Sequence, residues 1–113
     1  MTITNKKELL EKVKQNGWFL EDASDELKND KEVVLEAVKE CCWTLLIASK
    51  ELRNDREVVL TAVKQNGLAL QYASNELKND KEVVMEAMKQ DVIAIKFVGK
   101  ELLDKILNIL KTL

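Results

Sequence analysis

Apolar residues recur along the chain at helical spacing, within a unit of 25 residues. The apolar positions of a unit are the fourth, eighth, fifteenth, eighteenth and twenty-second, which in the third unit are Val59, Val63, Leu70, Ala73 and Leu77. Steps of four, seven, three and four keep these side chains on one helical face, and no segment alternates with period two as a strand does. The pattern therefore predicts helix throughout the unit.

The unit occurs four times without gaps, at residues 6–30, 31–55, 56–80 and 81–105. The first and third units share 14 of 25 residues, as do the second and third, and the third and fourth share 9. Short helical hairpins repeated at a fixed period stack on their neighbours as an α-solenoid. We therefore predict an all-α fold: a short α-solenoid of four 25-residue helical-hairpin repeats, forming a single domain over residues 1–113.

Polar residues predict where the first helix of each unit begins. Asn-Asp pairs at 29–30, 54–55 and 79–80 precede Lys or Arg and then Glu. Either the Asn forms a capping box with the Glu three residues later, or the Asp caps the helix directly. The first helices should therefore begin near residues 31, 56 and 81.

The first helix should end at Asn16-Gly17 and Asn66-Gly67, because glycine adopts the left-handed conformation at a helix end without steric cost. Cys41-Cys42 and Asp91-Val92 occupy the same place in the other two units, and a β-branched valine does not suit that conformation. Either these two turns have a different geometry, or the glycine marks a bend that needs no positive φ.

A second helix is expected from about Trp18, Trp43, Leu68 and Ile93 onward. It should reach about Leu27, Leu52 and Leu77 in the first three units. The serine inside it, at 24, 49 and 74, either bonds back to a carbonyl or breaks the helix into two short pieces. We expect the large apolar residues at its start to belong to the core.

The fourth unit lacks the Asn-Asp pair, so its last helix should run on towards residue 113. Its apolar residues cover two adjoining stripes, which is wider than one neighbouring helix requires. One interpretation is a C-terminal capping helix, over residues 102–113, that folds back over the end of the solenoid. The other is an oligomerisation surface that would make the protein a homodimer, with the residues Ile106, Leu107, Ile109, Leu110 and Leu113.

Composition restricts the class of protein. The 113 residues are 46% hydrophobic and 34% charged with a net charge of -2, which fits one small globular domain and gives no long-range attraction to nucleic acid or to a membrane. Neither a signal peptide nor a stretch of about 20 apolar residues is present. We therefore expect a cytoplasmic protein with no membrane contact, in which the adjacent cysteines at 41 and 42 are reduced.

The chain contains no histidine, the commonest general base and metal ligand. The repeated Asp30, Asp55 and Asp80 are explained by helix capping, and no unit has the alternating oxygen ligands of a calcium loop. Gly17 and Gly67 are single, so no phosphate-binding loop is expected either. We predict that the protein is not an enzyme and has no catalytic residues, metal site or cofactor.

The strings VKQNGLALQYASNELKNDKEVV (residues 63–84) and VKQNGWFLEDASDELKND (residues 13–30) resemble the tandem repeats classed as domain of unknown function 4116. The resemblance covers about residues 9–103, and the fourth unit departs from it at Asp91-Val92 and at Val98-Gly99. It implies a helical repeat of unassigned activity, and it supplies no catalytic residues.

Residues that change from unit to unit on a repeat scaffold are where recognition can differ. Several residues are apolar where a sibling unit is polar or small, and on one face they would form a partner-binding strip. The alternative is that they fill gaps left by imperfect repetition. These residues are Phe19, Leu46, Ile47, Tyr72 and Phe97.

Three functions are compatible with this sequence. The leading hypothesis is a non-catalytic protein-binding module, an adaptor or an inhibitor of a larger protein, whose acidic surface could cover a basic site of a nucleic-acid-handling enzyme. The alternative is a structural module that self-assembles through its C-terminal helix. Nucleic acid is an unlikely partner: lysines recur at 14, 39, 64 and 89, but glutamates recur equally often.

Overall fold

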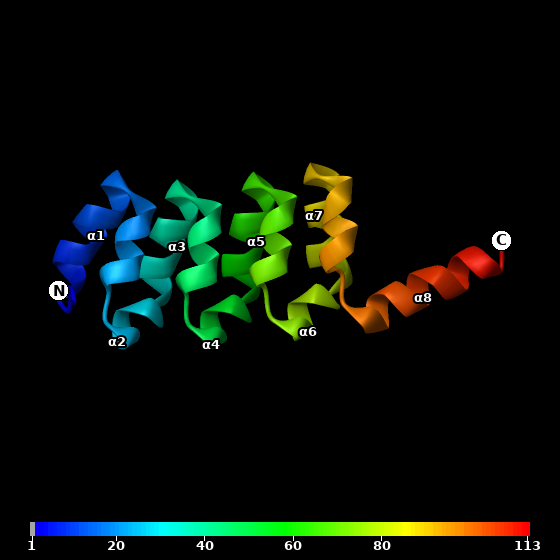
Figure 1. Cartoon of the computed structure of the whole chain (residues 1–113), viewed down its shortest axis with the longest axis horizontal. Coiled ribbons are helices and arrows are strands. Elements are labelled where there is room, and N and C mark those ends of the chain that lie inside the picture. Colours follow the sequence, from blue (N-terminus) through cyan, green and yellow to red (C-terminus); the bar gives the residue numbers. More distant parts are fainter. Residues whose placement is uncertain (1) are drawn as a thin grey trace.

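The structure of the chain, a computed structural model, describes residues 2–113 and is elongated, measuring 55 × 21 × 18 Å. Each unit contributes a ten-residue α-helix and a 3₁₀-helix, followed by a short α-helix in the first three units and by the longer α8 in the fourth (Figure 1). The ten-residue helices are α1 (Lys6–Gln15), α3 (Lys31–Glu40), α5 (Arg56–Gln65) and α7 (Lys81–Gln90). The 3₁₀-helices are η1 (Gly17–Asp22), η2 (Cys42–Ile47), η3 (Gly67–Tyr72) and η4 (Val92–Phe97). The short helices are α2 (Asp25–Lys28), α4 (Lys50–Arg53) and α6 (Asn75–Lys78).

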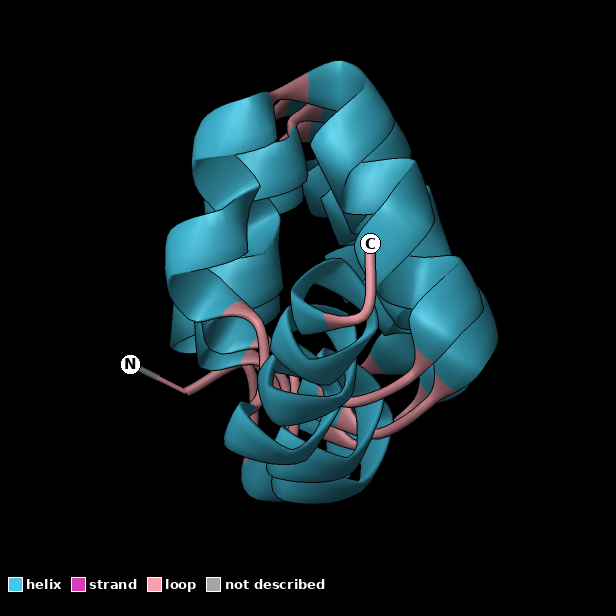
Figure 2. Ribbon diagram, turned by 90° about the vertical axis from the view of Figure 1, so that its right-hand side faces the viewer, coloured by secondary structure: helices cyan, strands magenta, loops and turns pink. Residues whose placement is uncertain are grey.

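Elements of one kind stack into three rows when the molecule is seen along its long axis (Figure 2). Within residues 2–113 there is no strand, and the only bridge joins Ile3 to Ala23. The all-α repeat fold is confirmed. No helix in this part of the chain combines the length and apolarity that crossing a bilayer requires.

Aspartate caps the ten-residue helices directly, which decides between the two capping arrangements. The side chains of Asp30, Asp55 and Asp80 accept hydrogen bonds of 3.1 to 3.2 Å from the N–H three residues later. Asn5 caps α1 in the same way, at 2.9 Å. Each helix therefore begins at the residue that the Asn-Asp pairs predict.

The second helix of the predicted hairpin is in fact two helices. Ser24, Ser49 and Ser74 are N-caps whose hydroxyls accept from the N–H three residues later, at 3.2 to 3.3 Å. The preceding segment is 3₁₀ because its buried residues lie three apart, as do Leu20 and Ala23 in the first unit. Of the two predicted roles of the serine, the structure therefore shows the second: it separates the segment into two short helices.

The turn before each 3₁₀-helix has one geometry in all four units. Asn16, Cys41, Asn66 and Asp91 are extended, with φ between -152° and -158°, and no residue in 2–113 has positive φ. The predicted left-handed glycine is therefore wrong, and the alternative of a bend without positive φ is confirmed. Glycine is favoured by close packing instead: a Cβ on Gly17 would lie 2.7 Å from the carbonyl oxygen of Ala37 in the next unit.

The core lies between successive units. In the third unit the fully or almost fully buried residues come from all three elements, and they include Val58, Val59, Ala62, Val63, Leu70 and Leu77. Burial of a Val or Leu side chain stabilises a fold by roughly 1.5 to 3 kcal/mol. Helices this short are not stable alone in water, so packing between units provides their stability.

Two polar ladders run alongside this core. The N–H groups of Ser49, Ser74 and Gly99 donate to carbonyls of the preceding unit, at 2.7 to 3.0 Å. Cations at the first position of α1, α3 and α5 each bind two carboxylates at the start of the next ten-residue helix, namely its capping Asp and the Glu two residues later. For Lys31 the Nζ–O distances are 3.1 Å to Asp55 and 2.9 Å to Glu57.

Helix α8 (Lys100–Lys111) leaves the stack instead of folding back over its end (Figure 1). None of its residues is buried. Gly99 has no side chain to cap it, and the Oδ1 atom of Asn79 accepts from the N–H of Leu102 instead, at 3.0 Å. Because Asp104-Lys105 replaces the Asn-Asp pair, nothing ends the helix there. The predicted capping segment at residues 102–113 is thus helical as far as Lys111, and Leu102 at its start packs against the core, but the helix does not fold back over the end of the stack.

Replacing Gly67 with alanine should destabilise the stack. A Cβ at this position would overlap the carbonyl oxygen of Ala87 and would lie 3.0 Å from its carbonyl carbon, so the next unit would have to shift. We expect the free energy of unfolding in urea to fall by about 1 to 3 kcal/mol. Val92→Ala, at the equivalent but exposed position of the fourth unit, is the control and should change the free energy of unfolding by less than about 0.5 kcal/mol. Equal stability of Gly67→Ala and the parent would contradict the packing explanation.

The ionic ladder should make stability depend on acid pH. Partial burial disfavours ionisation of Asp55, but the Val58 N–H and the Lys31 ammonium together outweigh it, so the pKa of Asp55 lies below its ordinary value of 3.8. A carboxylate whose pKa is lowered by folding stabilises the fold at pH values above its ordinary pKa. This stabilisation is lost as the pH falls through the folded-state pKa.

Asp55→Asn keeps a capping oxygen, as Asn5 shows for α1, but removes the charge. The variant should be less stable than the parent at neutral pH, and this difference should shrink steadily as the pH is lowered to about 2. Urea titrations at several pH values measure it. Added salt should reduce the difference in unfolding free energy between the two proteins at neutral pH. If that difference stays constant with pH, the ion pair contributes nothing to stability.

Candidate binding surface

The row of 3₁₀-helices presents apolar side chains to solvent. A 3₁₀-helix has three residues per turn, so the thirteenth and sixteenth positions of each unit share a face, turned away from the buried twelfth, fifteenth and eighteenth. Trp18 is 39% exposed and Leu46 is 50% exposed at these outward positions. Trp43 and Leu68 are half-buried there.

An aromatic contact joins this face across two units. The rings of Trp43 in η2 and Tyr72 in η3 meet edge to face, with centroids 6.1 Å apart and planes at 87°. Tyr72 has the same position in its unit as Ile47 and Phe97, and all three are half-buried and pack against the core. All of these side chains belong to the row of 3₁₀-helices, and the Trp43–Tyr72 contact joins two neighbouring units of the row. We call this set of residues the aromatic strip: Trp18, Trp43, Leu46, Ile47, Leu68, Tyr72 and Phe97.

Four of the five predicted partner-binding residues belong to the aromatic strip, and Phe19 does not. Phe19 has the fourteenth position of its unit, where Thr44, Ala69 and Ala94 are fully buried. The Cγ2 atom of Thr44 faces Gly17 in the preceding unit, so this position points backward along the stack. Phe19 belongs to the first unit of the described stack and lies at its N-terminal end, with the Lys12 ammonium 5.6 Å from its ring centroid.

The core assignment of the thirteenth position is wrong at both ends of the row. Trp18 and Ile93 are exposed, and only Trp43 and Leu68 are partly covered. The thirteenth position lies two residues before the buried fifteenth, so an α-helix or a 3₁₀-helix would both turn it away from the core. Trp18 and Trp43 were therefore missed as surface residues, although their offset of two residues from Leu20 and Leu45 was the signal that could have identified them.

Two segments of the chain, residues 5–53 and 55–103, match the sequence model of a family described as domain of unknown function (DUF4116). The chain belongs to the DUF4116 family. Each match spans two of the 25-residue units, so the repeat that defines the family is a pair of units. Neither a curated protein nor a solved structure matches the chain.

The C-terminal end of this DUF4116 chain carries a second apolar surface. Of the predicted oligomerisation residues, Ile106 is half-buried and the other four are exposed, namely Leu107, Ile109, Leu110 and Leu113. A groove of about 420 Å³ lies between α7 and α8, and six apolar side chains line it: Val84, Met85, Met88, Leu102, Ile106 and Ile109.

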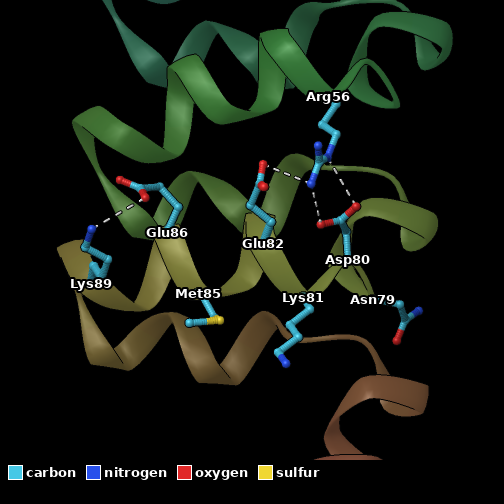
Figure 3. Close-up of a pocket in the computed structure, with 8 residues that line it drawn as sticks. All are labelled: Arg56, Asn79, Asp80, Lys81, Glu82, Met85, Glu86 and Lys89. Atoms are coloured by element: carbon cyan, nitrogen blue, oxygen red, sulfur yellow. Dashed lines mark hydrogen bonds and ion pairs between the residues drawn. The ribbon is translucent and has the colours of Figure 1, made fainter.

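The charged groups of the outer face of α7 are mostly paired (Figure 3). Arg56 from the preceding unit binds Asp80 at 3.3 Å and Glu82 at 2.9 Å, within an open depression of about 770 Å³. Lys81 extends from the other side of the helix and joins none of these pairs (Figure 3). Within residues 2–113, no three carboxylate or thiol side chains are placed to hold a metal ion.

The adjacent cysteines are both free, and they differ in environment. Cys42 is buried, and burial together with the neighbouring Cys41 raises the pKa of its thiol. Cys41 is half-buried and holds the cap position before η2 without a side-chain hydrogen bond. The hydroxyl of Thr44 donates to its carbonyl instead, at 2.8 Å. Both cysteines therefore occupy structural positions of the turn.

Proposed function

We propose that this DUF4116 protein is a non-catalytic protein-binding module, an adaptor or an inhibitor, that holds its partner on the aromatic strip. The observation that supports the proposal is the exposure of Trp18 and Leu46 beside the Trp43–Tyr72 contact, on one row of stacked helices. Tryptophan and tyrosine are enriched among the residues that dominate protein interfaces.

The scaffold beneath the aromatic strip favours recognition over a structural role. The strip residues vary between units, while the buried Leu of each 3₁₀-helix in the first three units, at 20, 45 and 70, does not. Because every unit is bonded to the next through backbone and ionic ladders, the outward side chains are held at fixed spacing. A rigid anchor loses little conformational entropy when a partner binds.

The charge next to the aromatic strip indicates the chemistry of the partner. In the first unit, exposed Glu21 and Asp22 hold the positions that are apolar Leu46 and Ile47 in the second. The strip therefore begins at an acidic rim beside Trp18. A partner with an apolar side chain flanked by basic groups fits this arrangement, which is compatible with inhibition of a nucleic-acid-handling enzyme.

The cytoplasmic location of the protein remains a prediction from the sequence. The two thiols are adjacent, and in a chain with no other cysteine they close no loop. Free thiols are typical of the reducing cytoplasm.

A paired capture experiment tests the proposal. The full chain and a Trp18→Ser, Leu46→Ser variant are immobilised and exposed to lysate of the source cell. Both replaced side chains are well exposed, so the variant should keep its helical circular dichroism. We expect partner recovery to fall at least about tenfold, since each anchor side chain contributes more than about 1 kcal/mol.

Lys96→Ser is the matched control, because Lys96 has the same position in η4 that Leu46 has in η2. It should recover the same partner in full. A photo-crosslinking residue at position 46 should also join the chain to that partner. Equal recovery by the double variant, or recovery that depends on Lys96 instead, would exclude the aromatic strip as the binding surface.

A further inference from the structure

A pocket of about 400 Å³ lies between the second and third units, at the edge of the aromatic strip. The second unit contributes Lys50 and Arg53 from α4, with Asn54 directly after that helix. The third unit contributes Tyr72, which also belongs to the aromatic strip, and Glu76 from α6. A group bound in this pocket therefore lies next to a side chain that we assign to partner binding.

The repeat provides internal comparisons for the residues of this pocket. Only the second unit has cations at both its twentieth and its twenty-third position. The side chain that the next unit contributes at its seventeenth position is Tyr72 here, whereas Ile47 and Phe97 at the other junctions have no polar atom. This junction therefore combines two cations, an arginine in place of lysine and a hydroxyl-bearing ring. The pairs at the twentieth and twenty-third positions of the other units are Asp25 and Lys28, Asn75 and Lys78, and Lys100 and Leu103.

The guanidinium of Arg53 lacks an acceptor. Arg53 is half-buried, and its Nε atom is buried without a hydrogen-bond partner in residues 2–113. A charged donor that is removed from water and left unpaired costs free energy until an acceptor reaches it. Since Nε itself is covered, the terminal nitrogens are the groups left to bind a ligand. Two nitrogens of a guanidinium match the two oxygens of a carboxylate, which a lysine ammonium does not.

The charge of the pocket favours a ligand with a single negative charge. Within residues 2–113, neither Lys50 nor Arg53 joins an ion pair. Glu76 is the carboxylate of the lining, and its Oε2 atom accepts from the Nδ2 of Asn54 at 3.1 Å. Glu51, the other acidic residue of this region, does not line the pocket. Two cations and one carboxylate leave one positive charge, which a carboxylate neutralises, whereas a phosphate ester of about -1.5 to -2 charges would be repelled by Glu76.

We propose that this pocket binds the carboxylate of an aspartate or glutamate side chain of the partner, next to the apolar group that the aromatic strip holds. The inference rests on the proposed function and adds a second chemical feature to the partner. Basic groups of the partner lie over the acidic rim of the first unit, and its carboxylate lies over the junction of the second and third units. The partner segment therefore has one direction along the strip, and the reverse direction would place like charges together.

An NMR titration of the full chain tests the pocket without any partner. The probes are two peptides blocked at both ends, acetyl-Leu-Gly-Glu-amide and its glutamine counterpart, which differ only in the charge of one side chain. We expect the glutamate peptide to shift the Nε–H resonance of Arg53 and to bind at least about tenfold more tightly than the glutamine peptide. Because the titration uses no lysate, its failure is observed separately from a failure of the proposed function in the capture experiment.

Two variants of Arg53 and a matched control assign the effect to this pocket. Arg53→Gln should abolish the preference for the glutamate peptide, and Arg53→Lys should keep only part of it. Lysine at the equivalent positions 28 and 78 indicates that a residue other than arginine is compatible with folding there. Lys78→Gln is the control, because Lys78 has the same position in α6 that Arg53 has in α4. It should leave both affinities unchanged.

The capture experiment links the pocket to the partner: Arg53→Gln should lower partner recovery about tenfold, and Lys78→Gln should not. Recovery unaffected by Arg53→Gln would show that the partner places no carboxylate in the pocket. The absence of binding, equal binding of the two peptides, or a preference that survives Arg53→Gln would each overturn the proposal. Tighter binding of the phosphoserine counterpart than of the glutamate peptide would also overturn it, because the pocket would then be a phosphate site.

Discussion

The contact between one unit and the next is the interaction on which this molecule depends. The short helices α2, α4 and α6 have four residues each and the 3₁₀-helices have six, so none can form alone. They form because valines and leucines on three elements close over the preceding unit. The backbone bond from Ser49 to Lys28 and the ion pairs of Lys31 fix the offset between neighbours. The stack ends wherever this contact is interrupted. Its two ends differ in structure.

The capping chemistry explains why one helix runs on where the others stop. In the first three units a serine begins the short helix and an Asn-Asp pair begins the next one. In the fourth, Gly99 offers no side-chain oxygen, and a Cβ there would collide with Asn79, the residue that caps the helix in its place. Lys105 then occupies the position at which, in the other units, an aspartate caps the next helix. A few substitutions at capping positions therefore leave the end of α7 uncovered, and no loss of hydrophobic residues is involved.

The repeat, the helical class and the Asp-capped helix starts could be predicted from the sequence, because period and capping are local properties. The outward orientation of the thirteenth position could also have been predicted from its offset of two residues from the buried fifteenth, but the size of its apolar residues favoured a core assignment. The reason for Gly17 was inaccessible, because the atom that a Cβ would meet belongs to Ala37 in another unit. Phe19 was misplaced because an end unit was compared with interior ones. For Gly17 and Phe19 the missing information was a contact between units.

The stiffness of the stack has a consequence for the aromatic strip. Backbone hydrogen bonds and ion pairs join each unit to the next, so the outward side chains of the 3₁₀-helices keep fixed separations. A partner whose apolar groups match these separations binds without ordering the strip, and little conformational entropy is lost on binding. A partner whose groups are spaced differently contacts only one unit at a time and gains only the affinity of that one contact.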